Sequence, residues 1–77
     1  MKVKVNAFAN LRAYAPAGEG PAELLLPGGA TLADLRAALR IPPTVQAVML
    51  VNGRRAEPAT PLHDGDEVTL FPPMEGG

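Results

Sequence analysis

The feature that most constrains the fold is one segment of helical periodicity between segments with strand patterns. Three leucines recur at helical spacing and would form one stripe of a helix: Leu32, Leu35 and Leu39. Thr31 is a favourable N-cap, and Asp34 three residues later completes a variant of the capping box. Pro42-Pro43 cannot continue a helix, so we expect a helix of about nine residues with Arg40 in its last turn. A helix this short needs tertiary packing to be stable.

The segments around this helix have patterns typical of strands. Residues 2–9 alternate, and Val3, Val5 and Ala7 lie on the face expected to meet the helix. Further strands are predicted, in chain order, at 22–26, 46–51, 54–57 and 67–71. Asn52-Gly53 between two of them is a hairpin turn signal. In the last strand, Val68 and Leu70 share one face.

The order of these elements predicts an α+β fold in which a mixed, four- to five-stranded sheet packs on one main helix. We expect one domain over residues 1–71, followed by a tail over residues 72–77. The loop 10–21 is rich in Ala, Gly and Pro, with room for a helical turn at residues 11–15.

Composition excludes several classes of protein. Of the 77 residues, 47% are hydrophobic, which is too many for a disordered chain. No apolar run reaches the ~20 residues that span a bilayer, and no signal-peptide core is present, so we expect a cytoplasmic protein that does not bind membranes. The absence of cysteine excludes thiol catalysis and iron–sulfur ligation.

Charge and histidine content argue against nucleic-acid and metal binding. The formal net charge is −1, and Arg54-Arg55 is the only basic pair, so we expect no nucleic-acid partner. His63 has no second ligand at metal spacing, and Asp64-Gly65-Asp66 lacks the remaining acidic positions of a calcium loop. No glycine cluster matches a phosphate-binding loop. We therefore predict no metal and no bound cofactor.

The tail is the strongest candidate for function. Pro72-Pro73 ends the last strand at Phe71 and favours a polyproline II conformation that projects the chain away from the body. Met74, Glu75, Gly76 and Gly77 follow, and two glycines without side chains can enter a narrow tunnel. A frayed terminus is the simpler alternative.

Residues 61–77 (PLHDGDEVTLFPPMEGG) resemble the C-terminal part of the ubiquitin-like sulfur carriers. They are most similar to the small subunit of molybdopterin synthase, in which Pro-Leu, Asp-Gly-Asp-Glu-Val, an aromatic residue, Pro-Pro and Gly-Gly follow one another. The Gly-Asp turn and Gly-Gly are also similar to those of the thiamine-pathway sulfur carrier. The resemblance implies a β-grasp (ubiquitin-like) roll.

For this chain, the resemblance implies that an ATP-dependent, ubiquitin-activating-type adenylyltransferase activates the carboxylate of Gly77. The activated carboxylate would become a thiocarboxylate. Residues 72–76 would then thread into a molybdopterin-synthase-like large subunit, where the sulfur passes to a pterin precursor. The chain would use no ATP itself and would not be an enzyme on its own. Sulfur transfer for thiamine, cysteine or tRNA thiolation, conjugation to proteins through Gly77, and a non-covalent interaction domain remain alternatives.

A partner interface is predicted beside the tail. Phe8 and Phe71 lie opposite the core face of the first and last strands, which are neighbours in a β-grasp sheet, so the rings would form one exposed patch. Leu50 and the pair Arg54-Arg55 are further candidates. The alternatives are that the loop 10–21 covers a ring and that the arginines belong to a solvated turn.

Overall fold

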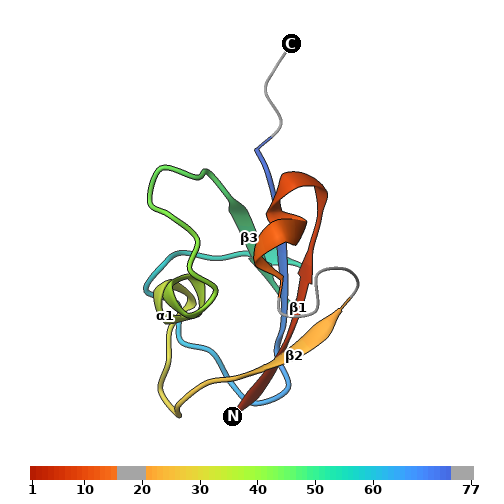
Figure 1. Cartoon of the computed structure of the whole chain (residues 1–77). Coiled ribbons are helices and arrows are strands. Elements are labelled where there is room, and N and C mark those ends of the chain that lie inside the picture. The colour runs from red at the N-terminus through yellow and green to blue at the C-terminus, as the bar shows by residue number, and fades with distance from the viewer. Residues whose placement is uncertain (16–20, 74–77) are drawn as a thin grey trace.

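The computed structural model describes residues 1–15 and 21–73. Its elements, in chain order, are β1 (Lys2–Ala7), the 3₁₀ helix η1 (Ala9–Tyr14), β2 (Ala22–Leu25), α1 (Leu32–Ala38), β3 (Val48–Val51), β4 (Arg54–Arg55) and β5 (Glu67–Phe71). The strands form one mixed sheet in the order β2-β1-β5-β3-β4, in which β1 and β5 are parallel and the other pairs antiparallel. Figure 1 shows α1 to one side of this sheet, as the sequence predicted.

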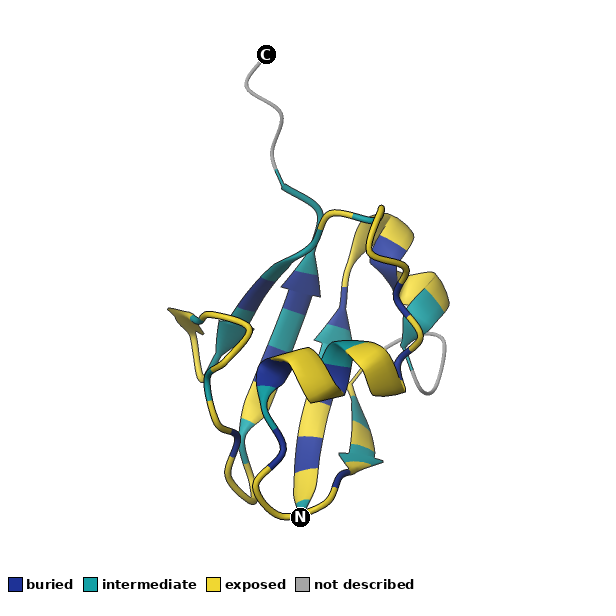
Figure 2. Ribbon diagram, turned by 90° about the vertical axis from the view of Figure 1, so that its left-hand side faces the viewer, coloured by how far each residue is buried: buried dark blue, intermediate teal, exposed yellow. Residues whose placement is uncertain are grey.

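The core lies between the sheet and α1. The predicted stripe of Leu32, Leu35 and Leu39 is buried, as are Val3, Val5 and Ala7 of β1 and Val68 and Leu70 of β5. Leu11 from η1, Ile41 after the helix and Leu62 before β5 belong to the same cluster. Each fully buried leucine contributes about 1.5–3 kcal/mol of transfer free energy. The alternation of buried and exposed residues along β1 is visible in Figure 2.

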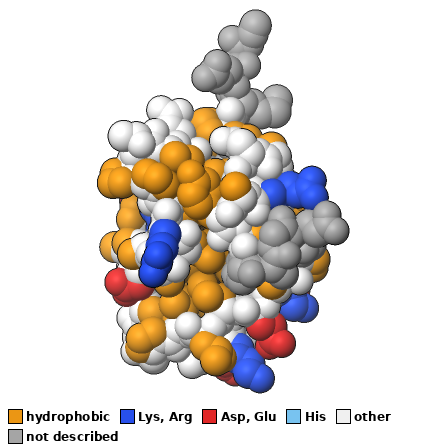
Figure 3. Space-filling view, in the orientation of Figure 1, with side chains coloured by type: hydrophobic (Ala, Val, Ile, Leu, Met, Phe, Trp, Pro, Cys, Tyr) orange, Lys and Arg blue, Asp and Glu red, His pale blue; other side chains and the backbone are white. Residues whose placement is uncertain are grey.

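A short domain cannot cover all of its apolar surface. Hydrophobic side chains reach the surface on the side where α1 and η1 lie (Figure 3). On the opposite face of the sheet, Phe8 and Leu25 are the large hydrophobic residues that remain exposed among the described residues.

The N-terminus of α1 is capped by its own residues and by the loop before β5. The capping box predicted for Thr31 and Asp34 is present, with each side chain accepting a hydrogen bond from the other residue's backbone N–H. The backbone N–H groups of Leu32 and Ala33 donate to the carbonyl oxygens of Thr60 and Pro58. These bonds satisfy N–H groups that a helix leaves unpaired, and they connect α1 to the segment that leads into β5.

The C-terminus of α1 corrects one prediction. The helix ends at Ala38, so Arg40 lies outside it, not in its last turn. Arg40 has a left-handed φ of 59°, its N–H donates to the Ala37 carbonyl, and the Ile41 N–H donates to the Arg36 carbonyl. This is the Schellman arrangement, which ends a helix and here turns Ile41 into the core.

Several strands are shorter than predicted. β1 ends at Ala7 because Ala9, with a φ of 55°, begins η1, which overlaps the helical turn predicted at residues 11–15. β2 ends at Leu25, and β4 comprises two residues only. β3 begins at Val48 because the Arg36 guanidinium, through Nη2, holds the carbonyls of Pro42 and Val45 in the preceding loop.

Arg40→Gly is expected to stabilise the protein, because glycine adopts the left-handed conformation without steric cost. The strain of ~1–2 kcal/mol relieved in the folded state exceeds the entropy cost of a more flexible unfolded chain, leaving a net gain of about 0.5–1 kcal/mol. Urea unfolding at pH 7 measures this difference. Arg40→Ala is the matched control, since it removes the same side chain but keeps the strain. Equal stability of the two variants would contradict the argument.

Candidate functional site

The predicted tail leaves the body from the centre of the sheet. β5 pairs with β1 on one side and with β3 on the other, so Phe71 is held opposite Val48 at the end of the strand. The ladder ends there, as predicted, because Pro72 and Pro73 have no N–H to donate. Both prolines are partly buried. The tail therefore begins at a strand that is hydrogen-bonded to a neighbour on each side.

Residues 74–77 lie outside the described residues. The predicted reactive residue Gly77 and the predicted threading residues Met74, Glu75 and Gly76 therefore remain sequence-based expectations. Only Pro72 and Pro73 of the predicted tail are described.

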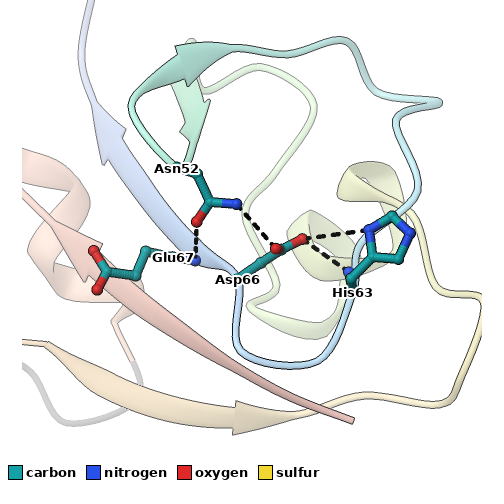
Figure 4. A network of polar contacts seen from close by, with 4 residues as sticks. All are labelled: Asn52, His63, Asp66 and Glu67. Atoms are coloured by element: carbon teal, nitrogen blue, oxygen red, sulfur yellow. Dashed lines mark hydrogen bonds and ion pairs between the residues drawn. The ribbon is translucent and has the colours of Figure 1, made fainter.

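A network of polar contacts holds the start of β5 against the β3–β4 turn (Figure 4). Asn52 Oδ1 accepts a hydrogen bond from the Glu67 N–H at 2.9 Å, and Asn52 Nδ2 donates to Asp66 Oδ1 at 3.0 Å. Asp66 Oδ2 accepts from the His63 N–H at 2.8 Å. The sequence predicted a turn at Asn52-Gly53, and both residues have positive φ, as in a type I′ turn.

The same contacts stabilise the ionised form of Asp66. The Asn52 side-chain hydrogen bond, followed by the His63 backbone hydrogen bond, holds the pKa of the Asp66 carboxyl below its ordinary value of 3.8. The His63 ring nitrogen Nδ1 is 3.9 Å from this carboxylate, and its side chain is 78% exposed. Its electrostatic effect on the Asp66 pKa is therefore smaller than that of the two hydrogen bonds. Among the described residues, no three His, Cys, Asp or Glu side chains are grouped closely enough to hold a metal ion.

The predicted aromatic pair lies at one end of the sheet face that points away from α1. The Phe8 N–H donates to the Leu70 carbonyl at 2.9 Å, and Ala7 pairs with Leu70, so Phe8 is next to Phe71 across the parallel strands. Phe8 is 48% exposed, and Phe71 is partly buried. Leu50 pairs with Thr69 and shares this face. We call these residues, together with Val48, the outer-face patch.

Val48 was not among the predicted interface residues. It pairs directly with Phe71 and so belongs to the same face. The strand 46–51 is apolar at nearly every position, so its alternation could not assign a face to each residue. The register with β5 provides that assignment.

The two predicted interface arginines are separated by the pleat of β4. Arg55 pairs with Leu50 and shares the outer face, whereas Arg54 pairs with Val51 and lies on the other face. Both are exposed. The structure therefore groups Arg55, but not Arg54, with the outer-face patch.

Comparison with known proteins gives one matching family and a set of similar solved structures. The sequence profile of the ThiS family matches residues 5–77. A candidate molybdopterin converting factor, subunit 1, from Pyrococcus furiosus is 33% identical, with a TM-score of 0.82 over 96% of this chain and 99% of that one. No curated protein matches this chain.

Two further solved structures belong to different functional settings. Small archaeal modifier protein 1 from Haloferax volcanii is 26% identical, with a TM-score of 0.78 over 95% of this chain and 98% of that one. A complex of subunits 1 and 2 of molybdopterin-converting factor from Helicobacter pylori contains a chain that is 28% identical, with a TM-score of 0.66 over the full length of both chains. Together with the sheet order, these likenesses confirm the predicted ubiquitin-like β-grasp fold.

The helices of the structure can be compared with the prediction that no segment of the chain spans a bilayer. Within the described part of the chain, no helix has the length and apolar character required to cross a bilayer.

The Asp66 network predicts how stability depends on pH. Because the folded pKa lies below the unfolded one, ionised Asp66 stabilises the fold at pH above 3.8, and this contribution is lost as the pH falls through the folded pKa. Asn52→Gly keeps the positive φ of the turn but removes both side-chain bonds. We expect this variant to lose about 1 kcal/mol at pH 7 and to show a smaller loss of stability on acidification. Urea unfolding at pH 7 and pH 3, with the Asp66 carboxyl titrated by NMR, measures both effects. Identical pH dependence in the two proteins would disprove the role of Asn52.

Proposed function

The chain belongs to the ThiS family, and from this premise we propose that it is a sulfur carrier whose C-terminal Gly77 becomes a thiocarboxylate. The observation that supports this most directly is a β-grasp body whose central strand leads into Pro-Pro-Met-Glu-Gly-Gly. Among acceptors, we propose a pterin precursor in the synthesis of the molybdenum or tungsten cofactor. Two similar structures are named as molybdopterin-converting-factor subunits, which supports this choice.

The proposed chemistry needs an activating partner. A free α-carboxyl group has a pKa of about 3.3–3.7, so it is an anion and a poor electrophile at neutral pH. Attack of the Gly77 carboxylate on ATP would form an acyl-adenylate and release pyrophosphate. A sulfide equivalent would then displace AMP to give the thiocarboxylate. Attack of the thiocarboxylate sulfur on the acceptor would form a thioester. Water would then cleave the bond between the Gly77 carbonyl carbon and the sulfur, which leaves the sulfur on the acceptor and regenerates the carboxylate. The chain has no cysteine to perform these steps itself.

The geometry of the described residues fits a carrier that presents its tail to another protein. β5 is paired on both sides, so the tail starts from a fixed point, and the outer-face patch lies directly beside that point. We propose that the large subunit contacts Phe8, Phe71 and Leu50 while residues 72–77 enter its active site. Glu75 would then require a basic or solvated position in that tunnel, because burial of an unpaired charge is costly.

Conjugation to proteins is the second candidate function. The likeness to small archaeal modifier protein 1 favours it specifically. Both functions would use the same activated Gly77, so isopeptide-linked adducts in cell extracts would distinguish a modifier from a carrier.

The test of the carrier proposal is intact mass spectrometry after co-expression with the host's activating enzyme and a sulfur source. We expect a gain of about 16 Da, the difference between sulfur and oxygen, that maps to Gly77. Deletion of Gly77 should abolish the gain while leaving the melting curve almost unchanged, because Gly77 follows the last strand, which ends at Phe71, by six residues in the sequence. Absence of the gain, with an activating enzyme shown to be competent on another carrier, would refute the proposal.

The outer-face patch predicts a selective loss of partner binding. Phe8→Asp should weaken binding to the cognate large subunit roughly tenfold or more, since aromatic anchors dominate such interfaces. The fold should persist with a stability loss of about 1 kcal/mol, because Phe8 is 48% exposed and its ring loses only part of its packing. Leu25→Asp is the matched control: Leu25 is 72% exposed at the other end of the sheet. Calorimetric titration measures both, and equal losses would argue against the patch.

A further inference from the structure

A groove of about 370 Å³ lies between α1 and the β3–β4 edge, and neither Pro72 nor Pro73 lines it. Figure 2 looks onto this side of the molecule, with α1 in front of the sheet. Small or apolar residues line it, among them Ala33 and Ala37 of α1, Ala47, Met49 and Ala56. Ala33 and Ala37 are exposed, so the helix presents a surface without bulk at this position. The volume is in the range of protein pockets that hold ligand groups.

The charged side chains that line the groove are positive. Among the described residues, Arg36 and Arg55 are the only charged ones that line it. Arg36 donates from Nη2 to the carbonyl oxygens of Pro42 and Val45, which satisfies hydrogen bonds but leaves its positive charge uncompensated. Within residues 1–15 and 21–73, neither arginine forms an ion pair with a carboxylate. An occupant with a carboxylate would therefore complement the groove.

The edge of the sheet offers backbone groups beside the groove. The Ala56 N–H donates to the Met49 carbonyl at 3.3 Å, so Met49 and Ala56 form a hydrogen-bonded pair. The neighbouring pair, Leu50 and Arg55, is then of the non-hydrogen-bonded type, in which N–H and C=O point away from the partner strand. β4 is the last strand of the sheet, so the N–H and C=O of Arg55 face its open edge.

We propose that the groove binds an extended peptide segment of a partner protein, in which a bulky apolar side chain lies within two residues of an Asp or Glu. The peptide backbone would pair with the N–H and C=O of Arg55, as in strand addition to a sheet edge. The apolar side chain would fill the space over Ala33 and Ala37, and the carboxylate would lie near Arg36. Arg55, whose side chain starts from the outer face of the edge strand, would add its charge at the rim of the groove. A peptide fits better than a small apolar acid because only a polypeptide can use both edge groups. Binding here would not require Gly77.

The test is selection of random 12-residue peptides displayed on phage against the full chain. Enriched sequences should combine a bulky apolar residue with an acidic one, and a synthetic peptide of the leading sequence should bind the free chain. Ala37→Phe fills the groove and should weaken this binding at least about tenfold. Ala38→Phe is the matched control on the same helix, since Ala38 does not line the groove, and should change binding less than about twofold.

Charge is tested separately. Arg55→Gln should weaken binding about threefold, and less at high salt. Arg40→Gln removes the same charge from a residue that does not line the groove and should have little effect. In ¹H–¹⁵N spectra, the largest peptide-induced shifts should fall on Ala33, Ala37 and Arg55 amides, not on those of Phe8 and Phe71.

Several results would overturn the proposal. No enriched peptide, enriched peptides without acidic residues, or equal weakening by Ala37→Phe and Ala38→Phe would each do so. Shifts caused by decanoate alone, with no enriched peptide, would identify a small-molecule site instead. A dimer of the chain that dissociates in Ala37→Phe would identify a second copy as the occupant.

Discussion

The structure depends on the position of β5 between β1 and β3. Its parallel pairing with β1 and antiparallel pairing with β3 bring three distant segments of the chain into one sheet. The same strand directs Val68 and Leu70 against the leucines of α1, and both are almost completely buried. Because the core and the sheet share this strand, the point at which the chain leaves the sheet at Phe71 is determined by the interactions that stabilise the fold.

Polar contacts outside the core set where this strand begins and where the helix begins. Asn52 bonds to Asp66 and to the Glu67 N–H, so the β3–β4 turn and the start of β5 hold each other in register. The carbonyls of Thr60 and Pro58 bind the N–H groups at the start of α1, which fixes the preceding loop. A small core leaves register less strongly specified, and these contacts supply the missing specificity.

The two surfaces with proposed partners lie on opposite sides of the β3–β4 edge. The outer-face patch faces away from α1 beside the tail, whereas the groove lies between α1 and the same edge. β3 takes part in both, because Val48 pairs with Phe71 and also lines the groove. One partner could therefore hold the tail while another segment occupies the groove.

The sequence by itself determined the element order, the leucine stripe of the helix, the Asn-Gly turn and the buried face of β1, because these depend on local spacing and turn chemistry. It also indicated Phe8 and Phe71 as neighbours, through the resemblance to β-grasp proteins. Only the tertiary structure decided the face of Val48 and Leu50, the separation of Arg54 from Arg55, and the helix end at Ala38. An all-apolar strand has no alternation to interpret, and a non-glycine residue in a left-handed cap has no sequence signal. Pairing with β5 settles the face of Val48 and Leu50, pairing of β4 with β3 separates the two arginines, and the burial of Ile41 sets the helix end. The pairing with β5 and the burial of Ile41 arise from contacts between segments far apart in the chain.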